Sequence, residues 1–193
     1  YVDLWLATPS STPIPLEETL LALQWAYSSG RAHYVGLSHR DTWDCALAWA
    51  KSETLPLTAV EEEFSLVCSS PLLGRAQDKN FGFLAHSPLA GGVLTGKYRH
   101  ATPPDSRAAS THLRHTVAPY LDSCDPIVEA LSQAAQGLES SIADIALAWV
   151  RDTPGVTSAI IGPRNLKQLE QLLGGQLELP SPIRGVLNEL AAE

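Results

Sequence analysis

Short apolar runs alternate with longer amphipathic segments along almost the whole chain, and this alternation strongly constrains the fold. The apolar runs predict five β-strands, at residues 2–7, 34–37, 57–60, 82–85 and 156–161. The amphipathic segments predict helices at residues 16–28, 126–136, 141–150, 166–173 and 182–192, and a helix that Asp41 caps and that runs to about Lys51. Apolar strands separated by helices indicate a parallel sheet covered by helices. Open doubly wound sheets and (β/α)8 barrels both fit, although a complete barrel has eight such units and this chain shows five.

The composition excludes several classes of partner. The chain has 193 residues and a formal net charge of −8, whereas nucleic-acid-binding proteins need a basic face, so we expect no nucleic-acid partner. There is no run of about 18 apolar residues, so we expect no membrane span. The three cysteines, Cys45, Cys68 and Cys124, are far apart and lack metal-binding spacing. They predict reduced thiols in a cytoplasmic protein rather than disulfides or a metal site.

The beginning of the chain and one internal segment depart from the regular pattern. The chain contains no Met, even at position 1, and its first residues already follow a strand pattern. We therefore expect that the natural N-terminus lies upstream and that this chain is truncated. Residues 99–125 are polar, rich in Pro and His, and without periodicity. They predict a long surface loop within a single domain over residues 1–193.

Polar residues follow each predicted strand, where parallel folds place their ligands. In chain order these are Thr8, Ser38-His39, the acidic triplet Glu61-Glu62-Glu63, His86-Ser87 and Gly162-Pro163-Arg164. A single Ser or His at such a position is usually a cap or a loop residue, and an acidic triplet is often a solvated face. Five clusters at five consecutive strand ends, however, would converge on one site. Within the triplet, strand geometry places Glu61 and Glu63 on one face and Glu62 on the other.

The segment from Ser87 to Tyr98 is the most informative motif. Its glycines let backbone N–H groups approach an anion, and Ser87 and Lys97 add a hydroxyl and a cation. The spacing from Gly91 to Lys97 approaches the P-loop pattern, but Tyr98 stands where that motif requires Ser or Thr. The sequence therefore disfavours a P-loop and leaves two alternatives, another phosphate cradle or a glycine-rich turn without a ligand.

Arg164 is a second candidate phosphate contact. It lies near the start of the helix predicted at residues 166–173, where the helix dipole and the guanidinium would act together on an anion. The alternative is an ordinary surface arginine, and position alone does not decide between the two.

The chain resembles the C-terminal two-thirds of aldo-keto reductases over nearly its whole length. The motifs that carry the resemblance are Tyr-Val-Asp-Leu at residues 1–4, Gly-Arg-Ala-His-Tyr-Val-Gly-Leu-Ser at 30–38, the segment 87–98 with Asp-Ser-Arg at 105–107, and Ile-Ile-Gly-Pro-Arg-Asn at 160–165. They occur in the family's order. The resemblance implies a (β/α)8 TIM barrel of which strands 4–8 and their helices are present, and it implies NADP(H) bound in extended form.

The resemblance also implies thirteen cofactor contacts. Those at the nicotinamide end are Ser38, His39, Glu61 and His86, with His86 in place of the aromatic residue that usually stacks on the ring. Those at the pyrophosphate are Ser87, Leu89, Gly91, Lys97 and Arg107. Those at the adenosine end are Gly162, Arg164, Gln168 and Gln171, with Arg164 on the 2′-phosphate.

The chain contains fewer of the family's catalytic residues than of its cofactor-binding residues. The family uses Asp, Tyr, Lys and His, and the resemblance places the first three upstream of Tyr1. Thr8 stands at the position of the His, where a hydroxyl can donate a hydrogen bond but cannot act as an imidazole. We therefore expect no catalytic residue, and no metal ligand, within this chain. The resemblance implies NADP(H)-dependent reduction of an aldehyde or ketone by the complete protein. The alternatives are a non-catalytic NADP-binding regulatory subunit, as in the potassium-channel β-subunit branch, and an inactive truncated fragment.

Five parallel strands cannot close an eight-stranded barrel, so two sheet edges should remain exposed. We expect these edges to promote self-association, in addition to contact with a small-molecule carbonyl substrate. The sequence does not identify that substrate, because in this family substrate specificity depends on loops that are variable or lie upstream of Tyr1.

Overall fold

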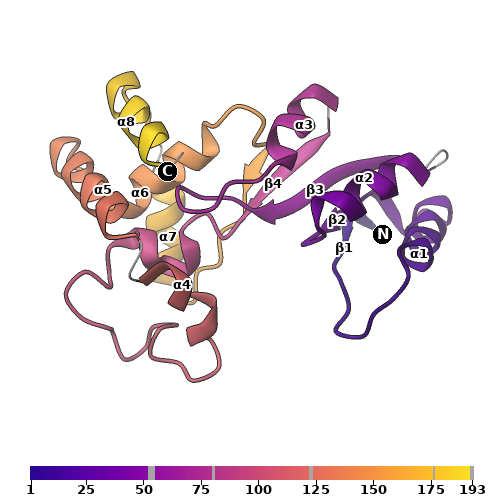
Figure 1. Cartoon of the computed structure of the whole chain (residues 1–193), viewed down its shortest axis with the longest axis horizontal. Coiled ribbons are helices and arrows are strands. Elements are labelled where there is room, and N and C mark those ends of the chain that lie inside the picture. Colours follow the sequence, from indigo (N-terminus) through magenta and orange to yellow (C-terminus); the bar gives the residue numbers. More distant parts are fainter. Residues whose placement is uncertain (52–54, 80, 122–123, 176, 192–193) are drawn as a thin grey trace. The chain divides into compact units, whose positions relative to one another are not determined.

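The computed structural model describes residues 1–51, 55–79, 81–121, 124–175 and 177–191, in which strands and helices follow one another as shown in Figure 1. The strands form one five-stranded sheet in the order β1-β2-β3-β4-β5, and β1 pairs with β2, and β2 with β3, in parallel. Strands that are neighbours both in sequence and in the sheet are typical of a singly wound barrel, whereas doubly wound sheets change direction at a switch point. The topology therefore favours a segment of a barrel over an open doubly wound sheet.

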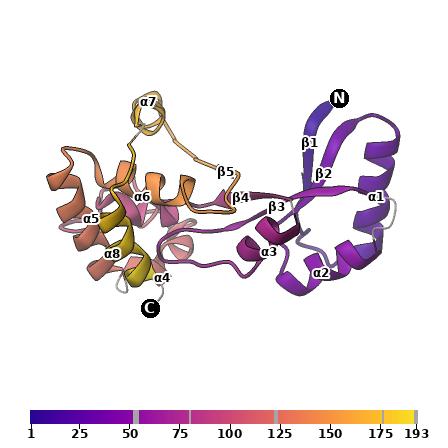
Figure 2. The ribbon, with the colours of Figure 1, turned by 90° about the horizontal axis from the view of Figure 1, so that it is seen from above.

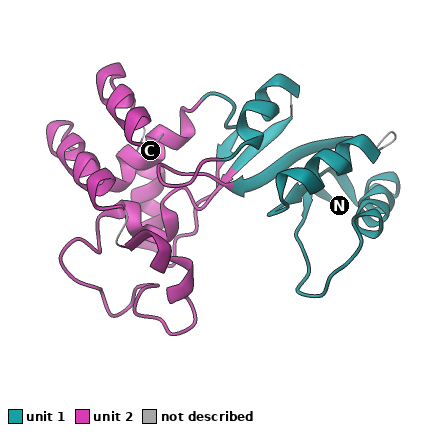
Figure 3. Ribbon diagram, in the orientation of Figure 1, with its two compact units in different colours: residues 1–62, 70–84, 154–158 teal, residues 63–69, 85–153, 159–193 magenta. Residues whose placement is uncertain are grey.

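The chain divides into two compact units, which Figure 3 shows in different colours. Unit 1 consists of residues 1–62, 70–84 and 154–158, and unit 2 of residues 63–69, 85–153 and 159–193. The single domain that the sequence predicts over residues 1–193 stays a prediction.

Unit 1 is built on the first three strands and the helices between them. Its elements are β1 (Val2–Ala7), α1 (Leu16–Ser28), β2 (Ala32–Ser38), α2 (Thr42–Lys51), β3 (Leu57–Glu63) up to Glu62, and α3 (Leu72–Lys79). Figure 2 shows α1 and α2 running alongside these strands. The bounds of β1 and α1 are those that the sequence predicted. The predicted cap of α2 is also confirmed, because the Asp41 carboxylate accepts a 2.8 Å hydrogen bond from the backbone N–H of Asp44.

The sheet of unit 1 packs tightly around Gly36. A β-carbon at this position would lie 2.2 Å from the carbonyl oxygen of Ala59 and 2.8 Å from Cδ2 of Leu6. The register between β2 and β3 shifts at the same place, between Val35 and Gly36. The neighbours Val35 and Leu37 are almost completely buried. Glycine is therefore required here by the close approach of β3.

Unit 2 is mainly helical. Its helices are η1 (Ala90–Thr95), η2 (Arg114–Thr116), α4 (Ala118–Leu121), α5 (Asp125–Gly137), α6 (Ile142–Arg151), α7 (Leu166–Gly174) and α8 (Ser181–Ala191). The core includes Leu131, Ile145 and Leu187, one each from α5, α6 and α8. A 2.8 Å hydrogen bond from Trp149 Nε1 to Asn188 Oδ1 joins α6 to α8.

Several elements differ from the sequence-based prediction. β3 continues through the acidic triplet to Glu63, whereas β5 (Ser158–Ala159) is shorter than the predicted strand 156–161. The sequence did not predict α3, η1, η2 or α4, the last two of which lie within the predicted loop 99–125. Residues 122–123 of that loop, and residue 192 of the predicted last helix, lie outside the described residues.

Two further features bear on the expectations from composition. No helix within the described ranges is both long enough and apolar enough to span a membrane. Cys45 and Cys124 are buried, and Cys68 is partly exposed.

We predict that Gly36→Ala lowers the free energy of unfolding by about 2 kcal/mol, because the added β-carbon overpacks the contact between β2 and β3. Urea unfolding followed by circular dichroism measures the change. The matched control is Gly74→Ala in α3, where nothing lies within 4 Å of an added β-carbon. That substitution should stabilise the helix by up to about 1 kcal/mol. Equal effects of the two variants would contradict the packing argument.

Candidate functional site

Unit 2 contains a cavity of about 330 Å³ at the end of β4 (Gly82–His86). Its walls come from the segment after β4, from the start of α6, from the residues that follow β5, and from α7. The lining residues are His86, Ser87, Pro88, Leu89, Gly91, Gly92, Thr95, Lys97, Arg107, Ser141, Ala143, Ile160, Ile161, Gly162, Pro163, Arg164, Gln168, Gln171 and Leu172.

The cavity brings together ten of the thirteen residues that the sequence predicts as cofactor contacts. They are His86, Ser87, Leu89, Gly91, Lys97, Arg107, Gly162, Arg164, Gln168 and Gln171. The other three, Ser38, His39 and Glu61, belong to unit 1. The cavity therefore groups the residues predicted for the pyrophosphate and adenosine ends, together with His86.

The backbone turns sharply where β4 ends. Ser87, Ala90, Gly91 and Gly92 have φ angles of 51°, 46°, 65° and 101°, all in the left-handed region. Ser and Ala rarely adopt such angles, and strained residues of this kind are concentrated at functional sites. The turn overlaps the start of η1, in which Gly91 and Gly92 are not helical, and both glycines lie on the cavity wall.

Two cations lie over this pair of glycines. A β-carbon at Gly92 would lie 2.5 Å from Nζ of Lys97, and one at Gly91 would lie 3.6 Å from Nη1 of Arg107. Both cations belong to the strap, which we define as residues 97–121. Bare glycine backbone beneath two positive charges is an arrangement that suits an anion.

Arg164 is a third cation in the cavity lining, and it comes from the segment between β5 and α7. Asn165 caps α7 by accepting a 2.9 Å hydrogen bond from the N–H of Gln168, and the N–H of Arg164 donates a 2.8 Å hydrogen bond to Oε1 of Gln168. The Arg164 guanidinium also donates to the backbone carbonyl of Asp105 in the strap. Arg164, just before α7, and Gln168 and Gln171 within α7 all line the cavity.

The charge of the cavity is opposite to that of the chain. Among the described lining residues there are three cations, Lys97, Arg107 and Arg164, and no carboxylate, although the whole chain has a formal charge of −8. None of the three takes part in an ion pair within the described residues. An anionic ligand would supply the negative charge that the described lining lacks. The set of donors in the cavity thus fits an anionic ligand.

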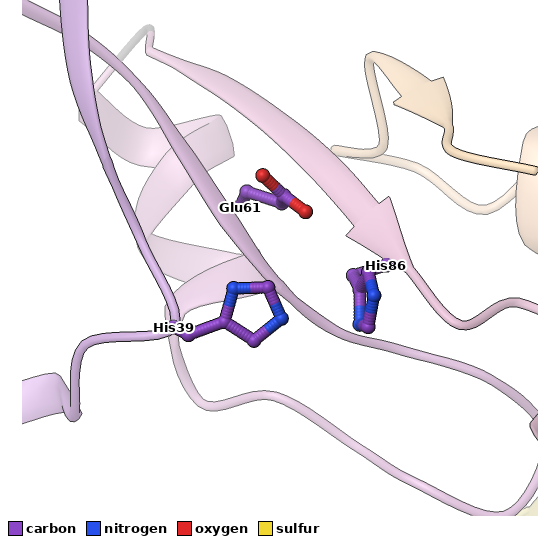
Figure 4. Close-up of side chains that lie close together, drawn as sticks. All are labelled: His39, Glu61 and His86. Carbon is purple, nitrogen blue, oxygen red and sulfur yellow. The ribbon is translucent and has the colours of Figure 1, made fainter. Parts of the chain in front are cut away.

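The three predicted contacts in unit 1 lie where β2 and β3 end. Ser38 is buried, and its hydroxyl shares a 2.5 Å hydrogen bond with Nδ1 of His39. The backbone N–H of His39 donates a 2.9 Å hydrogen bond to the carbonyl oxygen of Glu61, the register partner of Ser38. His39, like Ser87, has a left-handed φ, of 52°. Figure 4 shows His39, Glu61 and His86 together with the strands from which they come.

Thr8, at the predicted position of the catalytic His, follows β1 immediately and is exposed. It belongs to unit 1 and is not among the lining residues of the cavity in unit 2. The structure thus shows a hydroxyl at this strand end.

Sequence reasoning missed part of the lining, most clearly Ser141. Its side chain accepts a hydrogen bond from the N–H of Asp144, and the Asp144 carboxylate accepts one from the N–H of Ser141, which together form a capping box for α6. The Ser-x-x-Asp spacing was a usable signal for the start of this helix. Nothing in the spacing alone shows that the helix begins at a cavity.

The acidic triplet separates into different environments. Glu62 is partly buried and accepts a hydrogen bond from the Ser70 hydroxyl. Burial raises the pKa of Glu62 above its usual value of 4.5, while the Ser70 hydrogen bond opposes the shift. Glu63, the last residue of β3, accepts a 3.1 Å hydrogen bond from the Tyr120 hydroxyl. Each of these two carboxylates therefore has a specific hydroxyl partner and is not simply part of a solvated face.

Comparisons with a family model and with curated relatives agree on one protein family. The family model described as the Aldo/keto reductase family matches residues 1–180. L-glyceraldehyde 3-phosphate reductase of Escherichia coli K12 is 32% identical over 180 residues, which cover 89% of this chain and 52% of that protein. A probable voltage-gated potassium channel subunit beta of Oryza sativa subsp. japonica is 33% identical over 178 residues, which cover 88% and 54% of the two chains.

The solved structures agree on the fold. The crystal structure of a thermostable aldo-keto reductase superposes with a TM-score of 0.74 at 24% identity, and the match covers 98% of this chain and 60% of the other. The chain spans about half the length of the curated relatives it matches. The five-stranded parallel arrangement is thus part of a (β/α)8 barrel, as predicted.

We predict that Glu62→Gln raises the free energy of unfolding at about pH 7 and leaves it unchanged below about pH 4. The raised pKa means that folded Glu62 binds its proton more tightly than the unfolded chain does. Stability is therefore lost as the pH rises from the unfolded to the folded pKa. Glutamine keeps an acceptor for Ser70 without the charge. Urea unfolding across this pH range measures the gap between variant and parent.

The control for this prediction is Glu189→Gln, which removes an exposed carboxylate from α8. Its stability should run parallel to that of the parent at every pH. A gap for Glu62→Gln that is the same at low and neutral pH would show that burial of the charge is not its cause.

Proposed function

The chain belongs to the aldo/keto reductase family, and on this premise we propose that it binds NADP(H) and serves, within a complete barrel, the reduction of an aldehyde or ketone by hydride transfer. The observation that carries the proposal is the cavity of unit 2, with three cations and no carboxylate among its described lining residues. The relative named L-glyceraldehyde 3-phosphate reductase supports a small carbonyl compound as the substrate class.

Each cation has a distinct role in this proposal. Lys97 and Arg107, which lie over Gly91 and Gly92, would offset the charge of the pyrophosphate. Arg164, at the start of α7, would bind the 2′-phosphate that distinguishes NADP from NAD. Gln168 and Gln171 add amide groups on the same helix, at the adenosine end.

The nicotinamide end depends on different residues. When bound, NADPH supplies the hydride that reduces the carbonyl carbon. The hydrogen-bonded pair Ser38–His39, with Glu61 on the neighbouring strand, offers polar groups for the carboxamide, and His86 offers a flat ring for the nicotinamide. The Thr8 hydroxyl can donate a hydrogen bond but is too weak an acid to protonate the product. Reduction therefore requires a proton donor from outside these 193 residues.

A non-catalytic NADP-binding subunit is the second candidate. The hydroxyl of Thr8 at the strand end where the family has an imidazole favours it, and so does the likeness to a probable potassium channel subunit beta. In that function the same cavity would bind the cofactor without turnover.

We also propose that these 193 residues, taken on their own, self-associate, and that the protein has a cytoplasmic location. β1 is the first strand of the sheet, and Val2, Leu4 and Trp5 on it are exposed by 49%, 37% and 46%. An edge strand with such side chains is a site for pairing with another chain. Three cysteines that lack the spacing of a disulfide framework or a metal site support a reducing compartment.

We predict that Arg164→Ala weakens binding of NADPH roughly 10- to 100-fold and changes binding of NADH by less than about threefold. The loss corresponds to one charge-assisted contact with the 2′-phosphate, which NADH lacks. Titration of the reduced nicotinamide fluorescence measures both dissociation constants. Arg75→Ala, which removes an exposed arginine of α3, should leave both unchanged. An equal loss for the two nucleotides would overturn the assignment of Arg164, and no binding of either nucleotide by the parent would overturn the proposed function.

We predict that the 193-residue chain binds NADPH but does not oxidise it when a generic aldehyde is added, and that Thr8→His does not restore turnover. Both results follow from the missing proton donor. The absorbance of the reduced nicotinamide, followed with and without 4-nitrobenzaldehyde, measures the rate. Aldehyde-dependent oxidation by the parent chain would contradict the requirement for an outside donor.

A further inference from the structure

The turn that follows β2 in unit 1 carries an arginine whose side chain is bound to two helices. Arg40 comes directly after His39, and its side chain is only 11% exposed. Its Nη1 donates a 3.1 Å hydrogen bond to Oδ2 of Asp44 in α2, and its Nη2 donates a 3.2 Å hydrogen bond to Oγ1 of Thr19 in α1. The guanidinium therefore ties the end of β2 to both helices.

The backbone of the same turn is strained and is held by further hydrogen bonds. His39 has a left-handed φ of 52°, which costs free energy in a residue that has a β-carbon. Its N–H donates a 2.9 Å hydrogen bond to the carbonyl oxygen of Glu61, and the Arg40 carbonyl accepts a 3.8 Å hydrogen bond from Sγ of Cys45. A strained residue persists only where its surroundings fix it, and Arg40 adds restraints from α1 and α2 to those of the backbone.

Stability alone does not explain a buried arginine in this turn. The Nε–H of Arg40 is buried and has no hydrogen-bond partner within the part of the chain that the structure describes. An unpartnered buried donor costs free energy, and a buried ion pair often adds little to stability compared with apolar side chains of similar size. What the guanidinium supplies is geometry, because its planar fork fixes two directions at once.

His39 is the side chain that this turn presents to a ligand. Ser38 is 1% exposed, whereas His39 is exposed, so a ligand reaches the pair through the imidazole. The Ser38 hydroxyl shares a 2.5 Å hydrogen bond with Nδ1 of His39 and thereby orients the ring. A return of His39 to an ordinary φ would redirect its side chain and break this hydrogen bond. The position of the imidazole therefore depends on the restraints that hold the turn.

We propose that Arg40 is a positioning residue, which holds the turn after β2 so that His39 meets the carboxamide of the bound dinucleotide. Arg40 acts through Thr19 and Asp44 and need not touch the ligand. The part of this inference that concerns the dinucleotide rests on the proposed function. The restraint on the turn rests on contacts within unit 1.

The effect of Arg40 should be confined to one end of the ligand. Without the guanidinium the strained turn populates other conformations, so the affinity for the nicotinamide end falls with the fraction of chains in which the turn is competent. The cations proposed for the phosphates belong to unit 2 and do not depend on this turn. A ligand that lacks the nicotinamide should therefore bind as before.

Titration with two nucleotides tests this separation. NADPH has both ends, whereas 2′,5′-ADP has the adenosine and the 2′-phosphate without a nicotinamide. Arg40→Ala should weaken binding of NADPH about tenfold and change binding of 2′,5′-ADP by less than about twofold. Arg40→Lys keeps the charge but can hold only one of the two partners, so it should weaken NADPH binding about threefold. Fluorescence of the reduced nicotinamide and isothermal titration calorimetry measure the two dissociation constants.

Arg31→Ala is the matched control for this titration. Arg31 stands immediately before β2, at the end away from His39, and its guanidinium lies 4.2 Å from the centre of the Trp25 ring. Its loss should change neither dissociation constant. Thr19→Val should weaken NADPH binding in the same direction as Arg40→Ala, and the double variant should be no weaker than Arg40→Ala alone, because both remove one contact. Unchanged NADPH binding by Arg40→Ala, or an equal loss for both nucleotides, would overturn the proposal.

Hydrogen exchange tests the restraint without any nucleotide. The amide of His39 donates to Glu61, so its exchange rate reports how often the turn opens. Arg40→Ala should raise this rate about tenfold, while the amide of Val35, which is fully buried in β2, should exchange at the parental rate and show that unit 1 remains folded. Where Arg40→Ala does not fold, Arg40→Lys should raise the His39 rate about threefold.

The outcomes of the exchange experiment separate the two proposals. Unchanged exchange at His39 in both Arg40 variants would overturn the restraint, whatever the parent binds. Faster exchange at His39 in a chain whose parent binds neither NADPH nor 2′,5′-ADP would support the restraint and overturn the proposed function.

Discussion

Parallel pairing of consecutive strands is the constraint on which the site depends, because it brings the carboxyl ends of neighbouring strands to one edge of the sheet. In unit 1 it makes Ser38 the register partner of Glu61, so that the N–H of His39 reaches the carbonyl of Glu61. In unit 2 the N–H of Phe64 donates a 3.0 Å hydrogen bond to the carbonyl of His86. The chain then turns through a left-handed residue directly after β2 and after β4, at His39 and at Ser87. Strand pairing therefore determines which residues lie next to one another, and the left-handed turns determine the direction of the chain after each strand.

Sequence predicts those parts of the fold that local pattern controls, and fails where distant partners decide. β1 and α1 have their predicted bounds because periodicity marks both ends. β3 runs further than its apolar residues, and Glu62 and Glu63 accept hydrogen bonds from hydroxyl groups outside the strand. These belong to Ser70, 8 residues from Glu62, and to Tyr120, 57 residues from Glu63. A strand that ends in three acidic residues cannot be recognised without those partners.

The candidate site divides in the same way. Motifs that act through their own backbone, such as the glycines after β4 and the capped start of α7, are visible in the sequence and identify most of the cavity lining. The reason for Gly91 is not visible, because it lies in the packing of Val117, which belongs to the strap. Ser141 is similar: its spacing to Asp144 indicates the start of a helix, but only the packing of α6 brings that start to the cavity. Sequence thus identifies the residues that line the cavity better than it identifies the packing contacts that hold those residues in place.

Charge segregation separates cofactor affinity from chemistry in this chain. Three carboxylates elsewhere in unit 2 are engaged with other groups: Glu129 pairs with Arg99, Asp152 with Arg151 and Arg184, and Glu63 accepts from Tyr120. The described lining of the cavity supplies cations and no carboxylate, so an anion that binds there would add to the free energy of folding. The residues proposed for the nicotinamide end lie largely in unit 1, beside the exposed Thr8. In the proposed function, a phosphate end of this kind would retain a dinucleotide whether or not a proton donor is present, so binding and hydride transfer would be separable.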